Sequence, residues 1–169
     1  MQKIWNRPNQ SVWSLATIDS SNIGNMNICT YVTSVSMKPK LMMVAMYHNT
    51  KTYKNVTTTK KAILQLLSEE LAPVTRICGH LSGNTTDKLA RIRKRYSIDT
   101  LHEIPFFTKS AGYMELTLQK IIPVSGDHDL AIFTVVSHKN LNDELPWADA
   151  TGYQMQSKGL HHTNSKAVC

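Results

Sequence analysis

The chain alternates short runs of β-branched and apolar residues with clusters of turn-forming residues, and this alternation constrains its fold more than any other feature. The clearest case is the pair of runs Tyr113 to Val124 and Leu130 to His138, which flank a turn at residues 125–129 and predict a β-hairpin. Many short strands with few helices favour a closed antiparallel barrel with helical insertions, because closure removes exposed strand edges. We therefore predict a mainly β fold with short helices.

Further strands are predicted in the first half of the chain. The run Val12 to Ile18 precedes a turn cluster at residues 19–25, and a half-polar run from Asn27 to Met37 follows this turn. The almost continuously apolar run Leu41 to Tyr47 predicts a central strand that is covered on both faces. Another buried strand is expected over Ala62 to Leu67.

Short helices are predicted between these strands. Asn49 and Thr50 offer capping side chains for a helix over Lys51 to Thr59, which should end irregularly near Thr57 because threonine is a poor helix former. A second helix should begin at residue 68 and stop at Gly79, with one apolar face. The residues of this face are Leu71, Val74 and Ile77.

A third short helix is expected from about Thr86 to Arg95. Leu89 and Ile92 are predicted to face inward. The solvent side would be a basic face, made of Lys88, Arg91, Arg93, Lys94 and Arg95.

Length, charge and cysteine content limit the kind of protein. The 169 residues are enough for one domain with a substantial core. Lys and Arg total 19 against 12 Asp and Glu, and the formal charge of +7 favours phosphorylated ligands or polyanions without choosing between them. Cys29, Cys78 and Cys169 lack disulfide or metal-ligand spacing, which favours free thiols in a reducing compartment. No apolar run approaches membrane-spanning length, so we expect a cytoplasmic protein.

Five blocks of sequence, in this order and spacing, resemble the flavin reductase-like FMN-binding split-barrel family, of the NAD(P)H:flavin oxidoreductase or flavoredoxin type. The blocks are NICTYVTSVSMKP, LMMVAMYHNTKTYKNV, AILQLL, GHLSG followed by DKLAR, and GDHDLAIFTVV, and they cover about residues 12–138. The resemblance implies a split β-barrel that binds FMN and is usually a homodimer with the flavin near the subunit interface. We accordingly expect an FMN-binding domain over residues 1–138 and a C-terminal extension over residues 139–169 that is available to pack on a partner subunit.

The phosphate end of such a site has a physical basis in the residues themselves. The segment from His48 to Thr52 lies at a predicted helix start, where free backbone N–H groups and the helix dipole attract an anion. Asn49, Thr50 and Thr52 can donate hydrogen bonds, and Lys51 supplies positive charge. The alternative is a capping box with a solvated lysine. The matching position in the family favours phosphate binding by His48, Asn49, Thr50, Lys51 and Thr52.

For the flavin ring, the resemblance indicates two further groups of residues, which are Asn27, Ile28, Cys29 and Thr30, and then Ser34 and Ser36. Strand-edge N–H groups are expected to meet the polar rim of the ring, while Ile28 and Met46 cover its apolar face. The alternative is a plain barrel strand whose Thr and Ser side chains face water. Cys29 is expected to be a packing residue rather than a reactive thiol.

Asp127-His128 matches a GDH motif of many flavin reductases, in which the histidine lies near the flavin and the nicotinamide. The resemblance makes His128 the candidate catalytic residue, because an imidazole can hydrogen-bond a carboxamide or deliver a proton near neutral pH. In the alternative, both residues simply form the turn. Ser82 and Lys88 resemble a family segment that approaches the flavin, or else this segment is a turn followed by the basic face.

Other kinds of site find little support. His161 and His162 are adjacent and have no suitably spaced partner for a metal ion. There is no glycine-rich dinucleotide fingerprint, and no nucleophile stands out beside a base. Hydride chemistry is therefore expected to belong to the flavin.

The resemblance implies an oxidoreductase that transfers hydride from NADH or NADPH to FMN and then to an acceptor. One alternative keeps the FMN but lacks a nicotinamide site, which makes the chain an electron-transfer protein. Another alternative is a basic nucleic-acid-binding module that uses the face from Lys88 to Arg95, although only Tyr96 offers an aromatic platform there.

Overall fold

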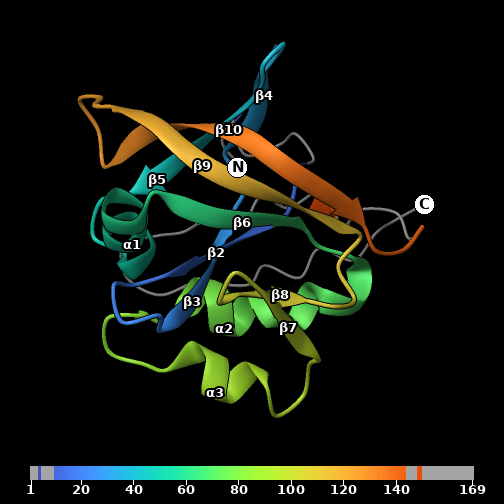
Figure 1. Ribbon diagram of the computed structural model, residues 1–169. Helices are drawn as coiled ribbons and strands as arrows, with labels where there is room; N and C mark the ends of the chain where they lie inside the picture. The colour runs from blue at the N-terminus through green and yellow to red at the C-terminus, as the bar shows by residue number, and fades with distance from the viewer. Residues whose placement is uncertain (1–3, 5–9, 144–147, 150–169) are drawn as a thin grey trace.

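The computed structural model describes residues 4, 10–143 and 148–149, and a seven-stranded antiparallel sheet dominates it (Figure 1). The strands, in spatial order, are β3 (Gly24–Cys29), β2 (Trp13–Ile18), β6 (Lys61–Leu66), β9 (Gly112–Ile122), β10 (His128–Asn140), β5 (Lys40–Tyr47) and β4 (Val32–Met37). Two short ladders pair β1 (Gln10–Ser11) with β11 (Ala148–Asp149), and β7 (Ile98–Leu101) with β8 (Ile104–Phe107). The β9–β10 hairpin and the strands predicted over residues 12–18, 41–47 and 62–67 are confirmed. The run predicted from Asn27 to Met37 is instead divided into two strands, β3 and β4, at opposite edges of the sheet.

The two edges of the sheet belong to one bent segment. β3 pairs with β2 at one edge, β4 pairs with β5 at the other, and only Thr30 and Tyr31 separate β3 from β4 in the chain. At the bend, the Ala45 N–H donates to the Tyr31 carbonyl at 3.0 Å. The bend brings the two sheet edges together, and this confirms the predicted barrel, split between β3 and β4.

The barrel interior is filled by alternate residues of the strands. Leu15, Val44, Leu64, Leu116 and Phe133 are all buried in this cluster. Helix α1 (Lys51–Thr59) adds the fully buried Val56.

Strand β5 corrects one prediction. It lies next to the edge strand β4 and is not central, and its residues alternate between buried and partly exposed. The residues with buried side chains are Met42, Val44 and Met46. The run is nevertheless continuously apolar, because the partly exposed residues on the other face, Leu41, Met43, Ala45 and Tyr47, are apolar as well.

A second core lies outside the barrel, over β2, β3 and β6. It is covered by the 3-10 helix η2 (Glu69–Val74), α2 (Thr75–His80), α3 (Lys88–Ile92) and β8 (Figure 1). The predicted apolar face is confirmed, since Leu71 and Val74 are buried and Ile77 packs against the same cluster. The helix begins as a 3-10 segment that contains Pro73 and continues through Gly79 to His80. No helix among the described residues has the length and apolar run needed to cross a membrane.

Helix α1 runs regularly to Thr59, so the predicted irregular end near Thr57 is wrong. The hydroxyls of Thr57 and Thr58 donate to the Lys54 carbonyl at 2.8 and 2.9 Å, and Thr59 donates to the Asn55 carbonyl at 3.0 Å. Lys60 then ends the helix in the left-handed conformation, with φ of 61°. The threonine side chains thus bond to the preceding turn rather than breaking it.

Replacement of Thr50, the N-cap of α1, should destabilise the fold. The Thr50 hydroxyl accepts from the Tyr53 N–H at 3.1 Å and donates to the Tyr47 carbonyl at 2.9 Å. We expect Thr50→Ala to lower the free energy of unfolding by about 1 kcal/mol in urea denaturation. Thr58→Ala, which removes an exposed hydroxyl in the same helix, should change it by less than about 0.5 kcal/mol. Equal effects would show that Thr50 does not cap α1.

Candidate functional site

Three segments that are far apart in sequence meet at the start of α1. The buried Asn25 of β3 donates through Nδ2 to the Thr52 hydroxyl at 2.9 Å. From the loop after α2, Asn84 Nδ2 donates to the Asn49 carbonyl at 3.2 Å. Gly83 of this loop lies so close that a Cβ there would overlap with Asn25 Oδ1 and lie 3.3 Å from the Lys51 Cβ. The structure therefore brings the predicted segments at residues 27–30, 48–52 and 82–88 to one region.

The first turn of α1 offers backbone donors. Thr50 caps the Tyr53 N–H, whereas the N–H groups of Lys51 and Thr52 precede the first intrahelical partner. No acidic residue lies in this turn, so the helix dipole is not neutralised there. Thr52 is 3 % exposed, and its hydroxyl faces inward to Asn25. An anion at this end would be held mainly by backbone groups.

Lys51 does not present a free charge. Its Nζ lies 3.3 Å from Asp19 Oδ2. The Ile23 and Ser21 backbone N–H groups, each 2.9 Å from Asp19 Oδ1, together with Lys51, hold the pKa of Asp19 below its ordinary value. The ionised Asp19 therefore compensates part of the Lys51 charge, which differs from the expected lysine dedicated to phosphate.

Lys88 is buried, which corrects its placement on the solvated basic face. Only 4 % of the residue is exposed, and Nζ donates to the carbonyls of Cys78 at 2.7 Å and Met26 at 3.1 Å and to Asn27 Oδ1 at 3.3 Å. Burial lowers the pKa of Lys88 from 10.5 to about 8. Since β3 is an edge strand, its outward carbonyls need a donor from another element. In the sequence, Lys88 lies four positions before the inward-facing Ile92. Residues with this spacing share one face of a helix, so the spacing indicates that Lys88 is buried as well.

The bond to Lys88 fixes the orientation of the Asn27 side chain. An ammonium group can only donate, so the amide oxygen of Asn27 must face Lys88. The Asn27 amide nitrogen is then directed away from Lys88 as a donor. Asn27 is half-buried and follows two residues after Asn25, on the same side of β3. The predicted residues Asn27 and Lys88 thus form one unit, in which only Asn27 is exposed enough to meet a ligand.

Asp129 was missed by sequence reasoning, which placed it in the turn. It is the second residue of β10, 7 % exposed, and its Oδ2 accepts from the Tyr53 hydroxyl at 2.7 Å. Its Oδ1 lies 3.0 Å from Nε2 of the predicted residue His48 and accepts from the Val124 N–H at 3.3 Å. The bond from Tyr53, and then His48, lowers the pKa of Asp129, while the same bond raises the pKa of Tyr53. The alternation Asp129, Ala131, Phe133 of inward residues was the available signal.

His128 lies at the same end of the barrel. Its Nδ1 is 2.6 Å from Asp127 Oδ1, and this contact holds the pKa of Asp127 below its ordinary value. The imidazole ring also contacts Tyr47, its partner on β5, and Tyr31 at the bend, with ring centroids 5.4 and 5.7 Å apart. Because Tyr31 directly follows Thr30, the bend links His128 to the predicted ring-contacting segment.

Other predicted residues are not brought together. Ile28 and Met46 are 2 % and 4 % exposed and pack in different clusters, Ile28 outside the barrel and Met46 inside it, so they cannot jointly cover one ring. Ser34 lies on β4, where its hydroxyl accepts from Lys40 Nζ at 2.7 Å, and Ser36 pairs with Leu41. Desolvation raises the pKa of the partly buried Cys29 to about 12, so its thiol stays protonated at neutral pH. Within the described residues no group of side chains is arranged to hold a metal ion, and His161 and His162 lie outside these residues.

The comparisons with known proteins agree with this fold. The chain superposes on a proposed oxidoreductase from Sinorhizobium meliloti 1021 with a TM-score of 0.76 and 22% identity, over 88% of this chain but only 50% of that one. It matches the NADH:FAD oxidoreductase SgcE6 of Streptomyces globisporus C-1027 with a TM-score of 0.77 and 13% identity, over 96% and 90% of the two chains. It also superposes on an FMN-binding protein from Thermus thermophilus, solved with p-hydroxybenzaldehyde. The TM-score is 0.71 and the identity 16%, over 83% of this chain and 77% of that one.

At the level of sequence, no curated protein matches the chain. Residues 7–156, which include nearly all the described strands and helices, match the family model of the flavin reductase like domain. The matched region also extends beyond residue 138, where the FMN-binding domain was expected to end. The chain therefore belongs to the flavin reductase-like domain family.

Proposed function

We propose that the chain is an oxidoreductase that binds FMN and uses it to pass hydride from NADH or NADPH to an acceptor. Membership of the flavin reductase-like family supports a flavin-related oxidoreductase. One observation supports placing the flavin in this region. β3, the start of α1 and the loop around Gly83 were predicted separately as cofactor contacts, and they meet here.

The residues present fit FMN. The α1 start offers unpaired backbone N–H groups without a neighbouring acidic side chain in the first turn, as a terminal phosphate requires. Gly83 lets its loop lie directly against Asn25 and Lys51 at the start of α1, because a Cβ there would overlap with Asn25 Oδ1. Asn27 presents an amide N–H donor, as the polar rim of a flavin ring requires. When bound, FMN would supply the ring that accepts hydride and passes it on.

In this proposal, the residues of the site have separate roles. The backbone of Lys51 and Thr52 holds the phosphate, and Asn27, oriented by Lys88, donates a hydrogen bond to the ring. The Nδ1–H group of His128 donates to the Asp127 carboxylate. In the neutral imidazole, Nε2 is then free to accept a hydrogen bond from a nicotinamide carboxamide. The aromatic rings of Tyr31 and Tyr47 hold the His128 ring in place from two sides.

The function is tested by following NADH and NADPH oxidation by the purified full chain, with FMN, FAD or riboflavin added. The proposal expects turnover that depends on both the protein and FMN. If the chain binds FMN and the bound flavin is reduced by dithionite but not by NADH or NADPH, the chain is an electron-transfer protein without a nicotinamide site. Absence of both flavin binding and turnover would exclude a flavin-dependent function.

Removal of the His128 imidazole should affect the nicotinamide step more than flavin binding. We expect His128→Ala to lower kcat/KM for NADH or NADPH by about 100-fold, a typical contribution of one positioned proton-transfer or hydrogen-bonding group, and to leave the FMN Kd within about threefold. The exposed His102, paired with Glu115 at 3.5 Å, provides a matched control, and His102→Ala should leave kcat/KM unchanged. An unchanged kcat/KM in His128→Ala would remove the residue from the mechanism.

A side chain at Gly83 should disturb the ligand site. We expect Gly83→Ala to weaken FMN binding by about tenfold and to lower the free energy of unfolding by about 1–2 kcal/mol, because the new Cβ displaces the buried Asn25 amide. Gly126→Ala is the control, since a Cβ at Gly126 meets no atom within 4 Å. The two values are read from FMN fluorescence titration and urea denaturation. Full FMN affinity in Gly83→Ala would place the flavin elsewhere.

A further inference from the structure

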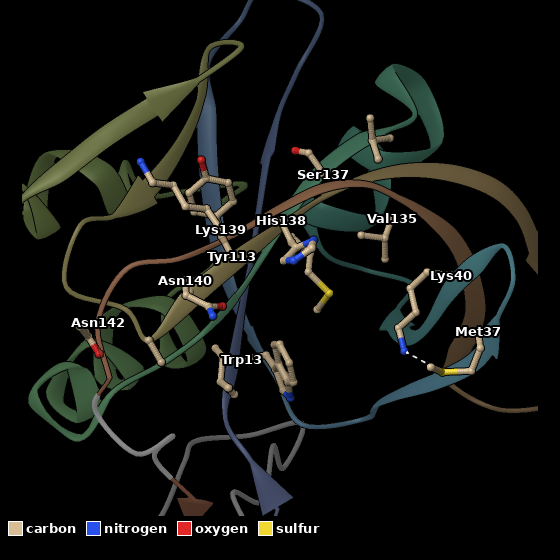
Figure 2. A pocket seen from close by; sticks show the side chains of 15 residues that line it. Trp13, Met37, Lys40, Tyr113, Val135, Ser137, His138, Lys139, Asn140 and Asn142 are labelled. Carbon is tan, nitrogen blue, oxygen red and sulfur yellow. Dashed lines mark hydrogen bonds between the residues drawn. The ribbon is translucent and has the colours of Figure 1, made fainter.

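A pocket of about 610 Å³ lies at the end of the barrel strands that is opposite to the proposed flavin site. It is lined by the last residues of β10, the first residues of β9, the β4–β5 hairpin and Trp13 (Figure 2). His128 begins β10, whereas the pocket residues of this strand are 135–140. None of the residues predicted to hold the flavin lines this pocket.

The walls of the pocket are apolar. Trp13, Tyr113, Met114 and Val135 are only partly buried, although they pack against the hydrophobic clusters of the protein. At the rim, Met37 is 76 % exposed and Val136 is 58 % exposed. Pockets of roughly 300–1,000 Å³ with apolar and aromatic walls are the usual size for small organic ligands. Both the volume and the walls therefore suit the ring system of a small molecule.

The charged groups at the pocket all have the same sign. Lys40 and Lys139 line it, and none of the described lining residues is an aspartate or glutamate. Lys40 Nζ is held by two neutral partners, Ser34 Oγ at 2.7 Å and Met37 Sδ at 3.6 Å. Within the described part of the chain, no carboxylate compensates the Lys40 charge, and the apolar walls beside it strengthen its field.

Glu115 of β9 follows the lining residue Met114, and its carboxylate is already engaged. Its Oε2 accepts from the Ser137 hydroxyl at 2.9 Å, and its Oε1 lies 3.5 Å from His102 Nε2. Among the described residues no carboxylate forms an ion pair with Lys40 or Lys139. The pocket therefore combines an apolar cavity with unpaired positive charge.

We propose that this pocket is a second binding site, separate from the flavin, for a small organic anion with an aromatic or otherwise apolar body. The body would lie against Trp13, Tyr113 and Val135, and the anionic group would lie at Lys40. A carboxylate of aromatic-acid size fits this combination of volume, apolar wall and charge.

The proposal is tested by calorimetric titration of the full chain with naphthalene-2-carboxylate and with its neutral isostere naphthalene-2-carboxamide. We expect saturable binding of the carboxylate, at least about tenfold tighter than that of the carboxamide. Added FMN should leave this binding unchanged, which separates the pocket from the proposed flavin site. No saturable binding, equal affinity for the two probes, or competition with FMN would each overturn the proposal.

Two variants assign the binding to the pocket. Lys40→Gln should reduce carboxylate affinity to that of the carboxamide, and Val136→Trp, which fills the exposed rim, should weaken both probes by at least about tenfold. Lys120→Gln, an exposed lysine of β9 that does not line the pocket, is the matched control and should bind like the unmodified chain. Circular dichroism verifies that the variants are folded. Light scattering that shows a dimer broken by Val136→Trp would make a second copy the occupant and overturn the proposal.

Discussion

Lys88→Met is expected to lower the free energy of unfolding by about 3 kcal/mol at neutral pH. Methionine keeps the side-chain stem but leaves the buried carbonyl oxygens of Cys78 and Met26, and the part-buried Asn27 Oδ1, without their donor. Each such oxygen costs about 1–3 kcal/mol. Removal of the buried charge recovers part of this cost. The fall in the pKa of Lys88 from 10.5 to about 8 means that folding disfavours its ammonium form by roughly 3 kcal/mol relative to the unfolded chain.

The stability contribution of Lys88 should also depend on pH. Its pKa falls from 10.5 to about 8 on folding, so the unfolded chain binds more protons between these two values. Stability from this group therefore rises with pH across that window, and it is lowest below pH 8, where both states are protonated. Between pH 7 and pH 9 the unmodified chain should gain about 1 kcal/mol relative to Lys88→Met.

Urea denaturation of both proteins at the two pH values measures these differences. Burial also raises the pKa of Cys78, and this makes stability fall with pH above about pH 9. Because Cys78 is buried in both proteins, the quantity to compare is the difference in unfolding free energy between them. Lys94→Met, at an exposed lysine just after α3, should lie within about 0.5 kcal/mol of the unmodified chain. Equal stability of Lys88→Met and Lys94→Met would contradict the buried placement of Lys88.

Lys51→Glu is expected to weaken FMN binding by at least about 100-fold and riboflavin binding by less than about fivefold. The substitution places a carboxylate in the first turn of α1, beside the proposed phosphate position and next to the ionised Asp19. At about 5 Å and an effective dielectric constant of 20, reversing this charge changes its interaction with a phosphate dianion by about 13 kcal/mol, before screening by salt reduces it. Riboflavin lacks the phosphate, so this repulsion does not act on it.

Lys54→Glu is the matched control for this prediction. Lys54 is exposed on the same helix, one turn further from its N-terminus, and its replacement should weaken FMN binding by less than about tenfold. Fluorescence titration of each variant with FMN and with riboflavin gives the four dissociation constants. An equal loss of affinity for both flavins in Lys51→Glu would show that the phosphate does not lie at the start of α1.

Much of the fold could be predicted because its strands carry local signals. The β9–β10 hairpin and helix α1 were expected within a few residues of their bounds, since turn clusters and a capping threonine mark their ends. The position of β5 beside an edge strand could not be predicted, because an apolar run has the same appearance in an edge-adjacent strand as in a central one. Neighbour order depends on the bend at Thr30 and Tyr31, which has no local sequence signature.

The candidate site was predicted only where local sequence signals or the family resemblance marked its residues. The α1 start could be identified from residues close in sequence, and the resemblance supplied the segments at Asn27 and Ser82. Contacts over long sequence separations were not available: Lys88 bonds to Met26, 62 positions earlier, and Tyr53 bonds to Asp129, 76 positions later. Whether a charged side chain is buried depends on such partners, so a basic run could not by itself distinguish Lys88 from its exposed neighbours.

The central claim is that FMN binds with its phosphate at the start of α1, and titration of the purified full chain with FMN and riboflavin tests it most directly. Fluorescence quenching should show saturable binding of one FMN per chain, at least about tenfold tighter than riboflavin, since one charge-assisted phosphate contact is worth more than about 1.4 kcal/mol. Absence of saturable FMN binding, or equal affinity for FMN and riboflavin, would contradict this account.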